Sequence, residues 1–151
     1  MYIGNLANML VDNCLTGDFE LKSVVLQGSK LGPILFLIYI NDLLLSLQQS
    51  KLGATIGDIT ISCLGFADDI VLASESPESL QMLINKCESW ALENRMVFNT
   101  NKCKVMIFNR PSSNLHFTMY NEELSIVNNY KYLGIEISNK NPTNLYIEHF
   151  S

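Results

Sequence analysis

Two adjacent carboxylates, Asp68 and Asp69, stand inside an apolar stretch of the chain that reads LGFADDIVLAS. An ionised carboxylate is costly to remove from water unless it is paired, hydrogen-bonded or bound to a metal. Apolar and β-branched runs, DITISCLGF and DIVLAS, lie on either side of Ala67 and Asp68. The pattern predicts a β-hairpin with Asp68 and Asp69 at its turn, where both carboxylates can reach water.

Adjacent aspartates can serve one metal ion only where the backbone departs from a regular strand, because successive strand side chains point to opposite faces. At a hairpin tip this restriction is relaxed. Mg²⁺ takes oxygen ligands and is commonly held by one or two carboxylates together with substrate phosphates. The tip therefore suits metal-assisted phosphoryl transfer, although aspartate is also common in turns that have no such role.

The rest of the chain predicts helices and short strands. Residues 3–15 fit a first helix, and TGDFELKSVVLQG after it alternates like a strand. A buried helix is expected over residues 31–48, because this segment is apolar and Pro33 suits a first helical turn. A second helix is expected to begin at Pro77 with Ser76 as its N-cap.

The second helix has apolar residues at helical spacing, which predict its inward face: Leu80, Leu83, Ile84, Cys87 and Ala91. Beyond it, apolar runs separated by turn residues predict strands in KVMIF, LHFTMY, ELSIV and YKYLGIEIS. The expected fold class is α+β, an antiparallel sheet with helices packed on one face. We expect one domain over residues 1–151.

The composition indicates a well-buried globular chain that is acidic overall. Of 151 residues, 48% are hydrophobic and only 17% are charged, against about 25% charged residues in typical soluble domains. The formal net charge is −5, whereas nucleic-acid-binding domains usually carry a basic footprint. On charge alone, this chain is not expected to hold a phosphate backbone unaided.

Several features indicate an intracellular protein. The four cysteines form no C-x-x-C pair and predict reduced thiols. The N-terminus lacks the basic and apolar regions of a signal peptide. The most apolar window, LGPILFLIYINDLLLSL, is interrupted by Asn41 and Asp42 and is too short to span a bilayer. We expect the chain in the nucleus or cytoplasm, neither secreted nor in a membrane.

A second polar feature precedes the first of these two long helices, in VLQGSKLGPILFLIYINDL. Gly28 lets a backbone approach a ligand closely, and Gln27 can both donate and accept hydrogen bonds. A helix N-terminus attracts phosphate. The segment favours a nucleotide-contacting loop, with an ordinary connecting loop as the alternative.

Four segments together resemble one family: QGSKLGPILFLIYINDL, LGFADDIVLAS, NTNKCKVMIF and YKYLGI, in this order. The chain resembles the palm of reverse transcriptases (RNA-directed DNA polymerases), most closely those of retrotransposons lacking long terminal repeats. Their acidic motif usually reads Phe-Ala-Asp-Asp, as it does here. The resemblance covers about residues 24–138.

The resemblance implies a role for each matching position. Asp68 corresponds to the catalytic metal ligand, and Asp69 to its supporting partner. The remaining positions are implied contacts to the nucleic acid and the nucleotide. Expected nucleotide or template contacts are Gln27, Gly28, Phe66, Ala67 and Lys102, with Asn99 in the same motif as Lys102. The expected primer grip is Tyr132, Leu133 and Gly134.

For intact members of the family, the resemblance implies Mg²⁺ or Mn²⁺, an RNA template, a DNA primer and deoxynucleotides. The family's palm also uses an aspartate on an earlier strand, in surroundings that Asp12, Asp18 and Glu20 lack. We therefore expect the first palm motif, the fingers and the thumb to be absent, with weak or no metal binding here. Losing one member of a catalytic unit can cost nearly as much as losing all, so the isolated chain is expected not to polymerise DNA.

Three interpretations follow from the sequence. The first is a fragment of a retroelement reverse transcriptase. The second is an inactive relic or a non-catalytic interaction module, which other polymerase segments complete in cis or in trans. The third, an RNA-dependent RNA polymerase palm, is disfavoured because those proteins usually carry Gly-Asp-Asp and lack the QGSKLGP context.

Overall fold

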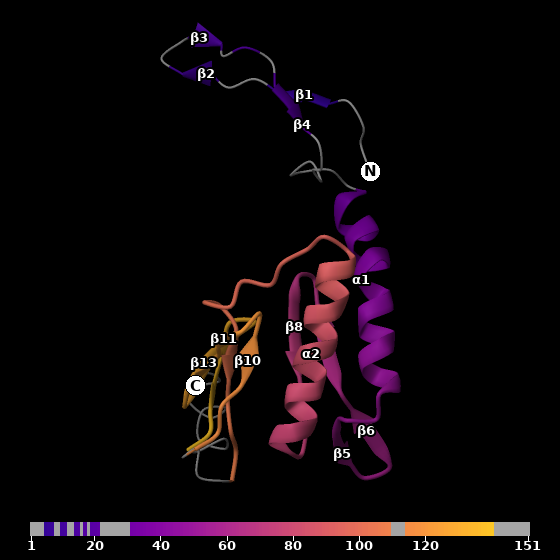
Figure 1. Cartoon of the computed structure of the whole chain (residues 1–151), viewed down its shortest axis with the longest axis vertical. Coiled ribbons are helices and arrows are strands. Elements are labelled where there is room, and N and C mark those ends of the chain that lie inside the picture. Colours follow the sequence, from indigo (N-terminus) through magenta and orange to yellow (C-terminus); the bar gives the residue numbers. More distant parts are fainter. Residues whose placement is uncertain are drawn as a thin grey trace, which may run out of the picture. The chain divides into compact units, whose positions relative to one another are not determined.

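The computed structural model describes residues 31–109 and 114–140, and in the N-terminal part residues 5–7, 10–11, 14–15, 17 and 19–21 (Figure 1). It divides into two compact units, Met1–Asp42 and Leu43–Ser151. Gln27 and Gly28, which were predicted to contact nucleotide and template, lie outside the described residues.

The N-terminal unit contains strands where a helix was predicted. Strand β1 (Asn5–Ala7) pairs antiparallel with β4 (Phe19–Leu21), and β2 (Leu10–Val11) pairs antiparallel with β3 (Cys14–Leu15). The predicted helix over residues 3–15 is therefore wrong. Its apolar spacing fitted a helix face, but the segment is rich in asparagine, which competes for backbone hydrogen bonds and is a weak helix former. The predicted strand at Phe19 is confirmed.

Helix α1 spans Gly32–Gln49, which confirms the helix predicted over residues 31–48. Ile40, Leu43 and Leu47 are buried and follow the spacing of one helix face. Its other side is also apolar, and we call its exposed side chains the outer face of α1: Ile34, Ile38 and Leu45. Among the described residues, no helix combines the length and apolar character needed to cross a bilayer.

Helix α2 spans Pro77–Glu93 and begins as predicted. The Ser76 Oγ accepts a hydrogen bond from the Ser79 N–H at 3.1 Å, and Pro77 occupies the first turn. The predicted inward face is confirmed at Leu83, Ile84, Cys87 and Ala91, which are buried, while Leu80 is half-buried.

The strands of the second unit form two-stranded pairs. Two consecutive antiparallel hairpins lie between the helices: β5 (Ala54–Ile56) with β6 (Ile59–Ile61), and β7 (Cys63–Phe66) with β8 (Asp69–Leu72). After α2, β9 (Lys104–Val105) pairs in parallel with β12 (Ser125–Ile126). Two further antiparallel hairpins are β10 (Thr118–Met119) with β11 (Glu122–Glu123), and β13 (Asn129–Tyr132) with β14 (Ile135–Ser138).

The predicted α+β class is confirmed in this coarse form, with two helices and short, mainly antiparallel strands among the described residues. The single antiparallel sheet is replaced there by separate pairs, one of them parallel. Figure 1 shows α2 beside β8 and β10, and α2 contacts both strands. The core of this unit lies where α2 meets the strands that follow it, and it includes Leu83, Cys87, Val105, Phe117, Met119 and Leu124.

A side-chain amide closes the edge of β10. The Gln81 Nε2 donates to the Thr118 carbonyl oxygen at 2.8 Å, and the Thr118 N–H donates to Gln81 Oε1 at 2.9 Å. Two turns further along α2, Glu88 Oε2 accepts the Tyr120 N–H at 2.9 Å. Exposed strand edges invite pairing with other chains, so Gln81 takes the place of a neighbouring strand.

Gln81→Leu is expected to lower the free energy of unfolding by about 2 kcal/mol, because two backbone hydrogen bonds are lost at about 1 kcal/mol each. Asn85→Ala is the control, since it removes only the side-chain bond between Gln81 Nε2 and Asn85 Oδ1. Urea unfolding measures both variants. Equal stability of Gln81→Leu and Asn85→Ala would rule out the edge closure.

Candidate metal-binding hairpin

The predicted acidic hairpin is present and closes through a two-residue loop. Phe66 pairs with Asp69, which leaves only Ala67 and Asp68 in the turn. Ala67 has a φ of 52°, as hairpin loops of this length require at their first position, because that geometry matches the twist of the strands. The turn position predicted for Asp68 is thus confirmed, whereas Asp69 is the first residue of β8, so that part of the prediction is corrected.

The two faces of this hairpin differ in their surroundings. Side chains directly opposite each other in an antiparallel pair lie on the same face, so Phe66 and Asp69 share one face. Phe66 is 60% exposed, and Asp68 and Asp69 are also exposed. On the other face, a Cβ added to Gly65 would lie 3.0 Å from the Leu44 Cδ1 of α1. The hairpin therefore rests on α1 with one face and presents Phe66 and Asp69 on its open face.

The carboxylates at the tip fit only part of a metal site. Among the described residues, no three His, Cys, Asp or Glu side chains gather in a group that could hold a metal ion. One or two carboxylates can contribute to a Mg²⁺ site in which waters and substrate phosphates supply the further oxygens. Asp68 and Asp69 are the residues that would hold such an ion.

The neighbouring hairpin β5–β6 has the same turn without the second aspartate. Its loop consists of Gly57 and Asp58, and Gly57 has a φ of 60° where Ala67 has 52°. Asp58 is exposed and is followed by Ile59. Asp58 is therefore a matched control for Asp68: the same loop position and charge, with no adjacent carboxylate.

Ala67 is in a backbone conformation that glycine adopts without steric cost. Ala67→Gly is expected to raise the free energy of unfolding by roughly 0.5–1 kcal/mol, since relief of the left-handed strain exceeds the entropy that glycine loses. Ala54→Gly, in β5, should instead lower it by roughly 0.5–1 kcal/mol. Urea unfolding measures both variants. If both change the free energy of unfolding in the same direction, the strain at Ala67 is refuted.

Lys102 lies in a turn built by Asn99. The Asn99 Oδ1 accepts the Asn101 N–H at 3.1 Å, and the Asn99 carbonyl oxygen accepts the Lys102 N–H at 2.9 Å. The Lys102 side chain is exposed. Within the part of the chain that the structure describes, no ion pair joins Lys102 to Asp68 or to another carboxylate. Its predicted nucleotide contact remains a prediction.

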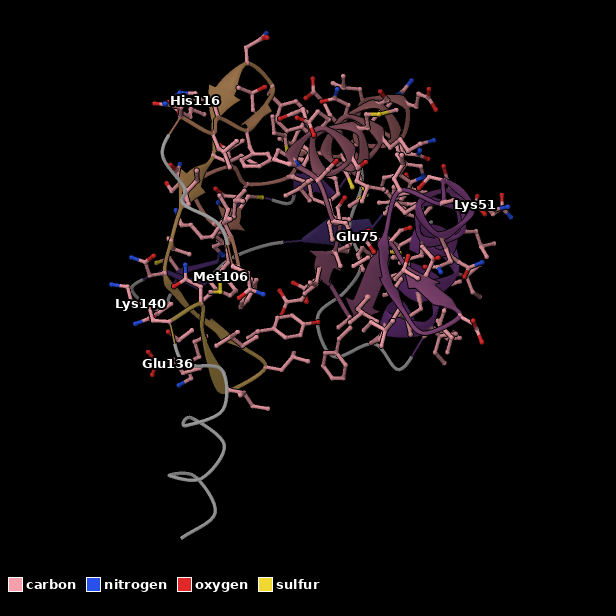
Figure 2. The ribbon with its side chains drawn as sticks, turned by 90° about the horizontal axis from the view of Figure 1, so that it is seen from below. Lys51, Glu75, Met106, His116, Glu136 and Lys140 are labelled. Atoms are coloured by element: carbon pink, nitrogen blue, oxygen red, sulfur yellow. The ribbon has the colours of Figure 1, made fainter. Side chains whose placement is uncertain are left out.

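The predicted primer-grip residues lie in the hairpin β13–β14. Leu133 and Gly134 form its loop, with φ values of 48° and 85°. The pairing places an apolar set on one face: Tyr130, Tyr132, Ile135 and Ile137. Lys131 opposite Glu136 lies on the other face, and Figure 2 shows Glu136 projecting outward, away from Glu75. The hairpin is thus amphipathic, with Leu133 exposed at its tip.

The sequence did not predict the hydrogen bonds that join the end of α1 to the strand leading into the acidic hairpin. Gln48, in the last turn of α1, donates through Nε2 to the Thr60 carbonyl oxygen at 2.5 Å and accepts the Ser62 N–H on Oε1 at 3.3 Å. A lone glutamine at a helix end carries no local signal of such a contact. Only the fold brings Gln48 to a strand more than ten residues away.

Comparison with known proteins places the chain in one family. Residues 2–137 match the family model described as "Reverse transcriptase (RNA-dependent DNA polymerase)". The RNA-directed DNA polymerase from mobile element jockey of Drosophila funebris is 27% identical, over 87% of this chain and 15% of its own length.

Two Pol polyproteins of retrotransposable elements are also similar. That of the type-2 element R2DM of Drosophila melanogaster is 32% identical over 68% of this chain and 10% of its own length. That of the type-1 element R2 of Popillia japonica is 28% identical over 87% of this chain and 23% of its own length. The chain thus spans less than a quarter of the length of these relatives. It belongs to the reverse transcriptase family and groups with the members from retrotransposons that lack long terminal repeats.

Proposed function

We propose that this chain is a palm polypeptide of an RNA-directed DNA polymerase, in which Asp68 holds a catalytic metal ion. The observation that carries the proposal is the exposed carboxylate in a two-residue hairpin loop, within a chain that matches the reverse transcriptase family. The reaction joins a primer 3′-hydroxyl to the α-phosphate of a deoxynucleotide, and pyrophosphate leaves. Members of this family are generally metal-dependent polymerases that act on nucleic-acid templates and primers.

Each aspartate has its own part in this proposal. Asp68, in the loop, would supply a carboxylate oxygen to Mg²⁺ or Mn²⁺, and Asp69, at the start of β8, would support it. A bound metal ion would stabilise the charge that develops on the attacking and leaving oxygens. The turn is supported by the strands on both sides, so the carboxylates need little reorganisation when the ion binds.

Nucleotide and nucleic acid lie on the open face of the hairpin in this proposal. Phe66 and Ala67 lie beside the primer end and the nucleotide, while Lys102, Gln27 and Gly28 contact nucleotide and template. The apolar face of β13–β14, with the strand residue Tyr132 and the tip residues Leu133 and Gly134, supports the primer terminus. The exposure of Phe66 and Leu133 supports these roles.

Other polymerase segments complete the site, in cis or in trans. The outer face of α1 supports this part of the proposal, because exposed apolar side chains gathered on one face mark a surface that another segment covers, and Ile38 is 66% exposed. The relatives carry most of their length outside the matching segment. By itself, this acidic chain is proposed to be inactive, and its place is the nucleus or cytoplasm.

A non-catalytic interaction module is the second candidate function. Two observations favour it: the net charge of −5, which opposes unaided binding of nucleic acid, and the absence of a third carboxylate beside Asp68 among the described residues.

Mapping of Mn²⁺ by NMR distinguishes the two candidates. Binding by this chain alone is expected to be weak, so paramagnetic broadening of the amide signals of residues 66–70 is expected only at high Mn²⁺ concentration, but still before broadening at Asp58. Asp68→Asn should abolish the difference, and Asp58→Asn should leave the response of residues 66–70 unchanged. Equal broadening at Asp58 and Asp68 in the unchanged protein would reject the metal site and favour the interaction module.

A further inference from the structure

The extended segment that leads to Asp68 changes its pairing partner at Ser62. Before this point β6 pairs with β5, and after it β7 pairs with β8. The Ala73 N–H donates to the Ser62 carbonyl oxygen at 3.0 Å. In a continued antiparallel ladder the Ser62 N–H would be accepted by the Ala73 carbonyl. Here Gln48 Oε1 accepts it, at 3.3 Å.

The side-chain amide of Gln48 therefore continues the hydrogen-bond pattern of the strand pair. Its Nε2 donates to the Thr60 carbonyl oxygen at 2.5 Å while its Oε1 serves Ser62, so the amide replaces a peptide group where β8 has ended. Both bonds are needed for this, and a neutral amide supplies both a donor and an acceptor. We call these two hydrogen bonds the Gln48 clamp, and they fix the hairpin at its base.

A second contact lies one turn earlier on the same side of α1. The Cys63 thiol donates to the Leu44 carbonyl oxygen at 3.5 Å, and the Leu44 side chain occupies the space above Gly65. Residues four apart on a helix are neighbours on its surface, so Leu44 and Gln48 form one continuous support. It extends from Ser62 at the base of β7 to Gly65, next to the residues of the tip.

We propose that Gln48 is a positioning residue for the metal-binding hairpin, which acts on Asp68 through the base of β7. This inference rests on the proposed metal site at Asp68. Without the clamp, the strand segment at Thr60 and Ser62 loses its fixed position against α1, and the carboxylates at the tip spread over more positions. Metal affinity at the tip then falls, although Gln48 never touches the ion.

Gln48→Leu tests the proposal, with Gln49→Leu as the matched control. Gln49 is the exposed next residue, and its side chain makes no hydrogen bond to another described residue. Hydrogen exchange of the Ser62 amide is expected to accelerate by about 10-fold or more in Gln48→Leu, and to stay within about 2-fold of the unchanged protein in Gln49→Leu. This arm measures the clamp alone.

The second arm measures Mn²⁺ at the tip. In Gln48→Leu, the Mn²⁺ concentration that half-broadens the Asp68 and Asp69 amides should rise about 3-fold, less than the 10-fold or more that direct partners of metal ligands cost. Faster Ser62 exchange with an unaltered Mn²⁺ response would overturn the positioning role, as would unaltered Ser62 exchange. No Mn²⁺ effect at Asp68 in the unchanged protein would instead overturn the proposed function, and the positioning role with it.

Discussion

Gly53→Ala is expected to lower the free energy of unfolding by about 3 kcal/mol or more, because the added methyl group overpacks against fixed backbone. A Cβ at this position would lie 2.3 Å from the Ile61 carbonyl oxygen and 2.6 Å from the Ser62 nitrogen. Neither atom can move without displacing the strand that leads to Asp68. Urea unfolding, with an unchanged m-value as the sign of an unchanged transition, measures the loss.

Gly57→Ala is the matched control, because Gly57 has a φ of 60° and open space around its Cβ position. Its cost is the left-handed conformation less the entropy that glycine loses on folding, roughly 0.5–1 kcal/mol. A loss in Gly53→Ala no larger than that in Gly57→Ala would contradict the close backbone contact.

Stability is expected to fall steeply at alkaline pH through Cys87. Burial raises the pKa of this thiol to about 12, and the nearby Cys63 and Cys103 thiols add to the rise. Between pH 9 and 12 the unfolded chain loses this proton while the folded chain keeps it. The contribution is complete below pH 9 and is lost as the pH rises toward 12, at about 1.4 kcal/mol per pH unit.

Cys87→Ala should reduce this slope to what Cys63 and Cys103 contribute, since burial raises the pKa of those thiols as well, at the cost of a small cavity at neutral pH. Cys14→Ala, which changes an exposed cysteine, should keep the pH dependence of the unchanged protein. Chemical unfolding at a series of pH values between 8 and 11 measures all three proteins. Parallel slopes for Cys87→Ala and the unchanged protein would contradict the assignment to Cys87.

The helices and the acidic turn could be predicted from the sequence because their signals are local. The cap Ser76 and the proline after it mark the start of α2, and the apolar spacing marks its buried face. The turn at Ala67 and Asp68 follows from the apolar runs on both sides of it. The position of Asp69 on β8 could not be read, since it depends on how tightly the loop closes.

The failures concern contacts between distant residues. The segment over residues 3–15 carries helix-like spacing, yet β1 pairs with β4 about a dozen residues further on. Gln48 and Gln81 read as ordinary helix-surface residues, and only the fold brings their amides to Ser62 and Thr118. Local sequence patterns do not indicate which distant residues pair, so the hydrogen bonds that hold the candidate site could only be found in the structure.

Primer extension on an RNA template with a DNA primer tests the central claim most directly: the chain carries the metal-binding hairpin of a polymerase that requires further polypeptide. The unchanged chain, Asp68→Asn and Asp58→Asn are compared in Mg²⁺ and in Mn²⁺. The predicted result is no extension by any of the three. Extension by the unchanged chain and by Asp58→Asn, but not by Asp68→Asn, would contradict the claim, because the chain would then be a complete polymerase by itself.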